Sequence, residues 1–134
     1  MDFSVLMSVY DKEEPRYLKE SLESIFCQTL QPTELILVED GPLSKQLIEV
    51  ISSFKKKLNI ISVSLNKNRG LAVALNEGLK KCSFDLVIRM DSDDICFEDR
   101  FEKQIKFMSE NKNISVSSGQ VEEWDQEFLN FFSI

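Results

Sequence analysis

The chain has 134 residues, which is enough for one ordinary domain with a hydrophobic core and too few for two. Hydrophobic residues make up 43% of it and charged residues 29%, a balance that is typical of globular proteins and excludes a disordered or fibrous chain. The net charge of −7 argues against a nucleic-acid partner, because affinity for a phosphate backbone depends on clustered Lys and Arg.

The first third of the chain predicts a strand, a helix and a second strand. Residues 3–10 form a short apolar run that is partly β-branched, which predicts a buried strand. Apolar residues then recur at helical spacing between Leu18 and Phe26, and Pro15 suits the first turn of that helix. A second apolar run at 35–38 predicts a strand that ends at the turn signal 39–42.

The same alternation continues to the end of the chain. Helical recurrences mark residues 47–54, 71–79 and 101–108, and apolar runs at 60–63, 85–90 and 114–116 predict three further strands. Strands that alternate with helices at this pitch indicate a mainly parallel sheet with helices on both faces. We therefore expect a three-layer α/β/α, Rossmann-like fold, formed by residues 1–134 as a single domain.

The cysteines and the first residues bear on the compartment. Cys27, Cys82 and Cys96 lack CxxC spacing, which suits a reducing compartment, and we expect each to be a small buried hydrophobe. The opening residues carry no signal-peptide pattern, and the run at 3–10 is too short to span a bilayer. We expect a cytoplasmic protein, for which peripheral attachment to the inner face of the membrane stays open.

An acidic segment follows the strand expected at 85–90. Asp91 and Asp93 are two residues apart at a strand end, and carboxylates in that arrangement suit Mg²⁺ or Mn²⁺, which bind one or two carboxylates plus substrate phosphates. The alternative is an acidic turn in which Asp94 starts the following helix. A DxD pattern alone leaves both interpretations open.

Other polar segments follow the remaining strands. Asp40 either belongs to an ordinary Asp-Gly turn or accepts hydrogen bonds from a nucleoside. Asn68 and Arg69 precede a helix start, where backbone amides and nearby cations favour an anionic ligand. In open parallel sheets, ligands bind at the carboxyl ends of the strands, so we expect these segments to share one edge.

Together these features resemble the inverting family-two glycosyltransferases, which have the GT-A fold and use nucleotide-diphospho-sugars. The resemblance covers about residues 3–119, and its order and spacing both match. It is carried by the segments Phe3–Tyr10, Ser21–Ile25 with Gln28-Thr29, Glu34–Gly41, Asn68–Ala72 with Asn76, and Arg89–Asp94.

The resemblance implies site residues and ligands. Metal binding by Asp91 and Asp93, with Mg²⁺ or Mn²⁺, is implied, together with a nucleotide-sugar donor (a UDP-sugar) and a glycan or lipid-linked acceptor of surface polysaccharide biosynthesis. The residues expected to line the nucleotide-sugar are Ser8, Tyr10, Asp40, Asn68, Arg69 and Asp91. Glu39 stands where many relatives have another Asp, and Asp94 is a further acidic candidate.

The family's catalytic base and acceptor site belong to the second half of its domain. Glu122, Glu123 and Asp125 give no firm match to that base, so the catalytic residue stays unassigned. We expect a truncated domain, in which this chain supplies donor and metal binding and little or no transfer by itself. Aromatic residues between Trp124 and Phe132 would permit self-association where their partner surface is missing.

Three rival functions differ in what they require. A non-catalytic nucleotide-binding α/β module would bind nucleotide without dependence on Asp93. A phosphatase-like enzyme would need a DxDx(T/V) setting, which Asp91–Ile95 fits poorly, and it would leave the segment at Asp40 unexplained. A dinucleotide-binding dehydrogenase is disfavoured because Tyr10–Glu13 follows the first strand in place of GxGxxG.

Overall fold

The structure is a computed structural model that describes residues 1–125 and 130–133. The chain divides into two compact units, Met1–Glu102 and Lys103–Ile134. The expectation of a single domain over 1–134 stays a prediction, and each unit is described by itself below.

The first unit is built on a four-stranded sheet in which every strand pair is parallel. The strands follow the order β3-β2-β1-β4 across the sheet, so β1 and β2 are the two inner strands. Their bounds are β1 (Ser4–Val9), β2 (Glu34–Glu39), β3 (Ile60–Ser64) and β4 (Val87–Arg89). The predicted alternation and the parallel sheet are confirmed, although β4 is three residues long where we expected six.

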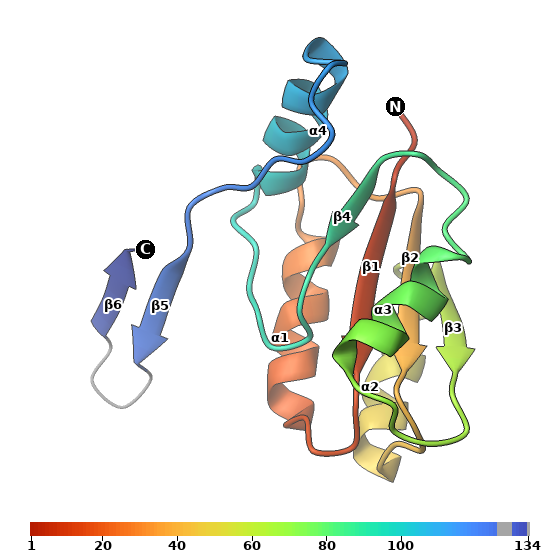
Figure 1. Ribbon diagram of the computed structural model, residues 1–134. Helices are drawn as coiled ribbons and strands as arrows, with labels where there is room; N and C mark the ends of the chain where they lie inside the picture. Colours follow the sequence, from red (N-terminus) through yellow and green to blue (C-terminus); the bar gives the residue numbers. More distant parts are fainter. Residues whose placement is uncertain (126–129, 134) are drawn as a thin grey trace. The chain divides into compact units, whose positions relative to one another are not determined.

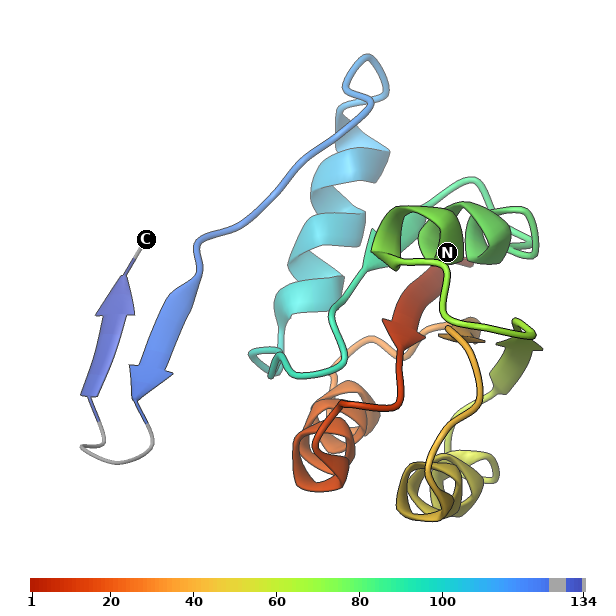
Figure 2. The same cartoon turned by 60° about the horizontal axis from the view of Figure 1, so that its bottom comes forward.

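Helices cover both faces of this sheet. α1 (Pro15–Phe26) and α2 (Lys45–Phe54) lie on one face, and α3 (Leu71–Leu79) lies on the other (Figures 1 and 2). α1 begins with Pro15 in its first turn, and α2 begins at Ser44, whose side chain accepts from the Leu47 amide at 3.3 Å. The α/β/α layering is therefore confirmed.

The core lies on both sides of β1 and β2. Leu6, Ile36 and Val38 face α3 and pack with Ala74 of that helix. Gly78 of α3 is buried as well, and a Cβ there would lie only 2.5 Å from both Leu6 and Val38. A close helix-to-sheet approach of this kind requires small residues on the helix. α3 is consequently held tightly against the two strands that end at the site.

A pair of buried aromatic rings lies next to the start of β1 in the first unit. Phe3 and Phe101 are completely buried, with ring centroids 5.8 Å apart and the rings nearly perpendicular at 83°. Edge-to-face pairs of this kind contribute beyond their buried area. Phe101 belongs to α4 (Arg100–Glu110), a helix that begins in the first unit.

Two local expectations are wrong. Residues 114–116 form no strand, and the next strand begins at Glu122. The helix expected up to Phe26 is confirmed, although Phe26 itself is 46% exposed and the ammonium of Lys57 lies over its ring at 5.7 Å. Cys27 is exposed, whereas Cys96 is buried as expected and Cys82 is half-buried.

The second unit contains a two-stranded antiparallel hairpin. It is formed by β5 (Glu122–Asp125) and β6 (Asn130–Ser133), with Glu122 opposite Ser133. The aromatic residues expected to mediate self-association belong to this region, and Phe128 among them lies outside the described residues. In the part of the chain that the structure describes, no helix has the length and apolar character that crossing a bilayer requires.

Candidate functional site

Three of the four strands end at the same level. Val9 of β1 lies opposite Glu39 of β2, and Glu39 lies opposite Ser64 of β3. β4 leaves the sheet earlier, because its last residue, Arg89, lies opposite Leu6. The segments that follow the strands therefore meet at one edge of the sheet, as the sequence predicted. The segment after β4 starts level with Leu6, before the end of β1.

Asp40 joins the segment after β2 to the segment after β3. The residue is only 4% exposed, and its carboxylate accepts hydrogen bonds from the Arg69 amide at 2.8 Å and from the Gly70 amide at 3.1 Å. The two oxygens of this carboxylate are thus used to hold the backbone that leads into α3. We call this arrangement the Asp40 clamp.

Gly41 allows the same two segments to approach closely. Its φ is +91°, and a Cβ at this position would lie 2.7 Å from the Asn68 amide nitrogen. A side chain would therefore be strained in backbone conformation and would collide with backbone atoms. Gly70, with φ +94°, then begins α3. The Asp-Gly pair after β2 is a requirement of this contact as well as a turn signal.

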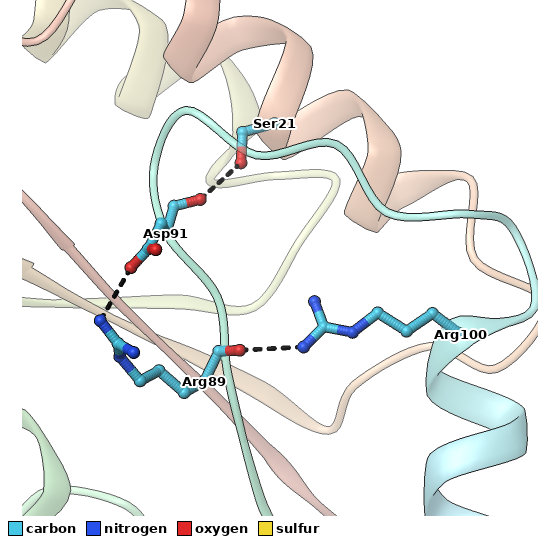
Figure 3. Close-up of polar contacts among 4 residues, drawn as sticks. All are labelled: Ser21, Arg89, Asp91 and Arg100. Atoms are coloured by element: carbon cyan, nitrogen blue, oxygen red, sulfur yellow. Dashed lines mark hydrogen bonds and ion pairs between the residues drawn. The ribbon is translucent and has the colours of Figure 1, made fainter. Parts of the chain in front are cut away.

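The acidic segment after β4 is held by its backbone. Arg100 donates to the Arg89 carbonyl at 3.0 Å, and Ser21 of α1 donates to the Asp91 carbonyl at 3.3 Å (Figure 3). The Asp94 amide also bonds the Asp91 carbonyl, at 3.3 Å, which closes a turn. α4 begins only at Arg100, so the alternative in which Asp94 starts the following helix is wrong.

The carboxylates of this segment lie in different surroundings. Asp91 is half-exposed, and one of its oxygens pairs with the Arg89 guanidinium at 3.0 Å (Figure 3). The Asp93 side chain is exposed. Burial raises the pKa of Asp94, the carboxylates of Asp91 and Asp93 raise it further, and Arg100 and Arg89 oppose that rise.

Glu13, which belongs to the segment between β1 and α1, joins this group. Burial raises its pKa, as do the neighbouring carboxylates of Asp93, Glu14 and Asp91, while a hydrogen bond with Ser92 opposes the rise. Glu13 Oε1 is a buried oxygen with no hydrogen-bond partner. Carboxylates from one loop thus raise the pKa of a carboxyl group in another loop at this end of the sheet, and a cation would relieve that repulsion.

The oxygen donors present fit a hard divalent cation that shares its coordination with a ligand. Among residues 1–125 and 130–133, no group of three or more His, Cys, Asp or Glu side chains is arranged to hold a metal by itself. Mg²⁺ and Mn²⁺ do not need such a cage, because they are commonly held by one or two carboxylates plus phosphate oxygens and water. Asp93 and the second oxygen of Asp91 offer donors of this chemical type.

The remaining predicted residues lie around the same edge. Ser8 is half-buried near the end of β1, and Tyr10, 44% exposed, follows the strand directly. Asn68 is exposed in the segment held by the Asp40 clamp. Arg69 is exposed too, and its side chain lines a surface hollow of about 520 Å³ along α3, together with Val73, Asn76, Glu77, Leu79 and Lys80.

Glu13 was not predicted from the sequence. The only signal was an acidic residue between β1 and the proline that begins α1, and such residues are usually solvated. Its proximity to Asp93 depends on the parallel pairing of β1 with β4, whose residues are more than 80 positions apart, as Ser4 and Val87 show. A sequence pattern with local spacing does not contain that information.

The sequence matches the model of a known protein family. Residues 4–131 match the family model described as glycosyl transferase family 2. The chain belongs to glycosyl transferase family 2. The match covers both compact units of the chain.

Two relatives in this family have descriptive names. The chain is 46% identical over 123 residues to the UDP-Gal:alpha-D-GlcNAc-diphosphoundecaprenol beta-1,3-galactosyltransferase of Escherichia coli, covering 92% of this chain and 45% of that protein. It is also 46% identical over 124 residues to the amylovoran biosynthesis glycosyltransferase AmsE of Erwinia amylovora, covering 92% of this chain and 47% of that protein. The chain thus spans about half the length of these relatives.

Solved glycosyltransferase structures share the fold. The S. aureus TarS 1–349 structure in complex with UDP-GlcNAc superimposes with a TM-score of 0.74 and 28% identity, over 84% of this chain and 32% of that one. The Pyrobaculum calidifontis mannosyltransferase PcManGT, in complex with GDP-Man and Mn²⁺, gives a TM-score of 0.69 at 21% identity, over 80% of this chain and 32% of that one. The GT-A type of fold expected from the sequence is therefore confirmed.

Proposed function

We propose that this chain binds a nucleotide-diphospho-sugar together with Mg²⁺ or Mn²⁺, as the donor-binding part of a glycosyltransferase that builds surface polysaccharide. The observation that carries the proposal is the position of Asp91 and Asp93 directly after β4, in a segment that Ser21 and Arg100 hold by its backbone at the strand-end edge. Family membership supports it, as does the edge itself, because open parallel sheets bind nucleotides there.

The residues divide into two groups with different tasks. Asp93 and Asp91 would hold the cation, which supplies neutralisation of the diphosphate charge and so favours its departure as a leaving group. Arg89 pairs with one oxygen of Asp91 and thereby orients the other oxygen. Ser8, Tyr10 and the backbone ordered by the Asp40 clamp would line the nucleoside. The base and the acceptor site stay unassigned.

The nucleotide and the acceptor are the finer parts of the proposal. The E. coli relative is named for UDP-Gal and a diphosphoundecaprenol acceptor, and the TarS complex contains UDP-GlcNAc. The PcManGT complex contains GDP-Man. We infer a UDP-sugar donor and a glycan or lipid-linked acceptor, because the E. coli relative whose name states UDP-Gal is 46% identical to this chain, whereas PcManGT is 21% identical.

Calorimetric titration tests the donor site. We expect UDP and UDP-sugars to bind in the presence of Mn²⁺, and we expect Asp93→Asn to lower that affinity at least tenfold, because the variant removes a carboxylate charge from the metal. Asp85→Asn is the matched control, since Asp85 is an exposed aspartate at the opposite end of β4. Robust binding that ignores both Mn²⁺ and Asp93 would favour the alternative, a non-catalytic nucleotide-binding module.

A further inference from the structure

α1 presents a row of polar side chains to the chain segment between β4 and α4. Ser21 and Ser24 are three residues apart, and Gln28 follows four residues later in the turn that closes the helix, so all three share one side of α1. Ser21 and Gln28 are buried, although an amphipathic helix normally turns apolar residues inward. We call these three residues the α1 polar stripe.

The two serines bond the backbone of the acidic segment and of the residues just after it. Ser21 Oγ donates to the Asp91 carbonyl at 3.3 Å (Figure 3), and Ser24 Oγ accepts from the Cys96 amide at 3.1 Å. Ser24 Oγ also donates to the Ser21 carbonyl, at 2.7 Å. The stripe therefore holds both ends of the segment 91–96 through main-chain atoms.

Gln28 makes the most extensive set of these contacts. Gln28 is only 5% exposed. Its Nε2 donates to the Phe97 carbonyl at 2.6 Å and to the Ser24 carbonyl at 3.2 Å. Oε1 accepts from the Phe101 amide at 3.0 Å. The neighbouring Thr29 amide donates to the Glu98 carbonyl at 2.8 Å. The amide group of Gln28 thus uses both its donor and its acceptor function on this part of the chain.

Hydrogen bonds from the α1 polar stripe to the main chain can order the acidic segment although its carboxylates repel one another. Asp91, Asp93 and Asp94 are consecutive or nearly so, and their charges repel one another when no cation lies between them. Side-chain hydrogen bonds to these carboxylates would hold them but would also compete with a ligand. Contacts to the main chain order the segment and leave its carboxylate oxygens available, apart from the one Asp91 oxygen that pairs with Arg89.

We propose that the α1 polar stripe is a positioning device that holds the Asp91–Asp94 carboxylates in place for the cation and the diphosphate before either binds. The inference rests on the proposed donor and metal site and adds the residues that shape it. Gln28 is its main positioning residue, since the hydrogen bonds of its side chain to this part of the chain go to backbone atoms of Phe97 and Phe101.

The first test needs no ligand. Gln28→Glu keeps the shape and one acceptor but replaces the Nε2 donor, and we expect amide hydrogen exchange across 91–97 to become at least tenfold faster. The Arg69 and Gly70 amides, held by Asp40, should keep their exchange rates, because α1 does not contribute to that clamp. Accelerated exchange in both regions would indicate a general packing role and would overturn the proposal.

Gln31→Glu is the matched control. Gln31 is exposed, and its Nε2 donates to the carbonyls of Ile25, Phe26 and Gln28, so these bonds close the same helix end and do not reach residues 91–101. The control introduces the same negative charge a few residues away. An equal acceleration of exchange at 91–97 in this control would mean that added charge, and not the lost donor, loosens the segment.

The second test measures the consequence for binding. With MnCl₂ and UDP as the probes, calorimetry should show at least a tenfold loss of affinity in Gln28→Glu and less than a twofold change in Gln31→Glu. Unchanged affinity in Gln28→Glu would overturn the link to the site. Should the wild-type chain not bind Mn²⁺ and UDP, the proposed function fails, and the exchange result still decides whether the stripe orders the segment.

A milder variant keeps the proposal testable if Gln28→Glu does not fold. Ser24→Ala removes the acceptor of the Cys96 amide and leaves Gln28 intact. We expect accelerated exchange centred on Cys96 and a smaller loss of affinity for Mn²⁺ and UDP, and Ser24→Thr, which keeps the hydroxyl, should restore both. A Ser24→Ala variant that matches the wild type in both measurements would overturn the role of the serines.

Discussion

Asp40 shows how a carboxylate can shape a binding edge from within. It is buried, and it spends its two oxygens on the amides of Arg69 and Gly70, so its contribution to the site is the shape of the segment that leads into α3. Hydrogen bonds that backbone amides donate to a charged acceptor are worth roughly 1.5–3 kcal/mol each. The clamp is therefore expected to matter for stability whether or not a nucleotide is present.

We expect Asp40→Asn to destabilise the protein by about 1–3 kcal/mol, because an amide offers one acceptor oxygen and turns an NH₂ group toward an amide donor. Urea unfolding measures this difference. Glu39→Gln makes the same chemical change at the adjacent, half-buried position and should cost less than about 0.5 kcal/mol. Equal stability of the wild type and Asp40→Asn would show that the clamp contributes nothing to folding.

Glu34 is a second buried carboxylate, at the opposite end of β2. Burial favours its neutral form, but hydrogen bonds from the Ser83 amide (2.6 Å), the Ser4 hydroxyl (2.7 Å) and the Ser83 hydroxyl (3.1 Å) outweigh burial. The pKa of Glu34 consequently lies below its ordinary value of 4.5. The charged form ties β1, β2 and the residues before β4 together.

This lowered pKa sets the sign of a pH effect. The folded state holds the Glu34 proton more weakly than the unfolded state, so the stabilisation is complete above pH 4.5 and is lost as the pH falls through the folded pKa. We expect Glu34→Gln to lower the free energy of unfolding at pH 7 by about 1–3 kcal/mol and to lose less stability than the wild type below pH 4.5. Urea unfolding across pH 3–7 would contradict this if the two curves stayed parallel.

At the scale of elements, the packing of α3 on the sheet decides where its first turn lies. Gly78 faces the Leu6 and Val38 side chains, and a Cβ there would lie 2.5 Å from each. Leu6 can turn its end away, but the β-branched Val38 has little rotamer freedom. The helix therefore approaches β1 and β2 as closely as its glycine permits.

We expect Gly78→Ala to destabilise the protein by about 1 kcal/mol or more, since overpacking costs about 1–3 kcal/mol and the gain in helix propensity returns about 1 kcal/mol at most. Thermal or urea unfolding measures the change. Gly119→Ala is the control, because a Cβ there meets open space, and it should be neutral or slightly stabilising. A more stable Gly78→Ala variant would mean that Leu6 and Val38 move aside for the added methyl group at little cost.

At the scale of the whole molecule, the features that the sequence predicted correctly are those that follow from the periodicity of apolar residues. The order of strands and helices, the parallel sheet and the edge at which polar segments meet all follow from apolar spacing and turn residues. Phe26 shows the limit of that reasoning, because apolar character at helical spacing does not say that Lys57 from another segment will cover the ring. Residues 114–116 have the composition of a strand but form none, because a strand also needs a partner strand with which to pair.

The candidate site was predictable in composition and less so in geometry. Local spacing placed Asp91 and Asp93 at a strand end, and the resemblance to a family identified their chemistry. The Asp40 clamp and the position of Glu13 join residues that are remote in sequence, and such contacts follow only from the completed sheet. The roles of the α1 polar stripe were also hidden, because serine and glutamine on a helix are usually solvated.

Because β1 is an inner strand, its two neighbours, β2 and β4, pair with it at different entropic cost. Its pairing with β2 joins Ser4 to Glu34 through six residue pairs, whereas its pairing with β4 joins Ser4 to Val87 through three. Closing the longer loop costs the unfolded chain about 0.9 kcal/mol more than closing the shorter one, by the logarithm of loop length. The acidic segment thus follows the sheet's most remote and shortest pairing, so we expect a general loss of stability to loosen the carboxylates before it loosens the pairing of β1 with β2.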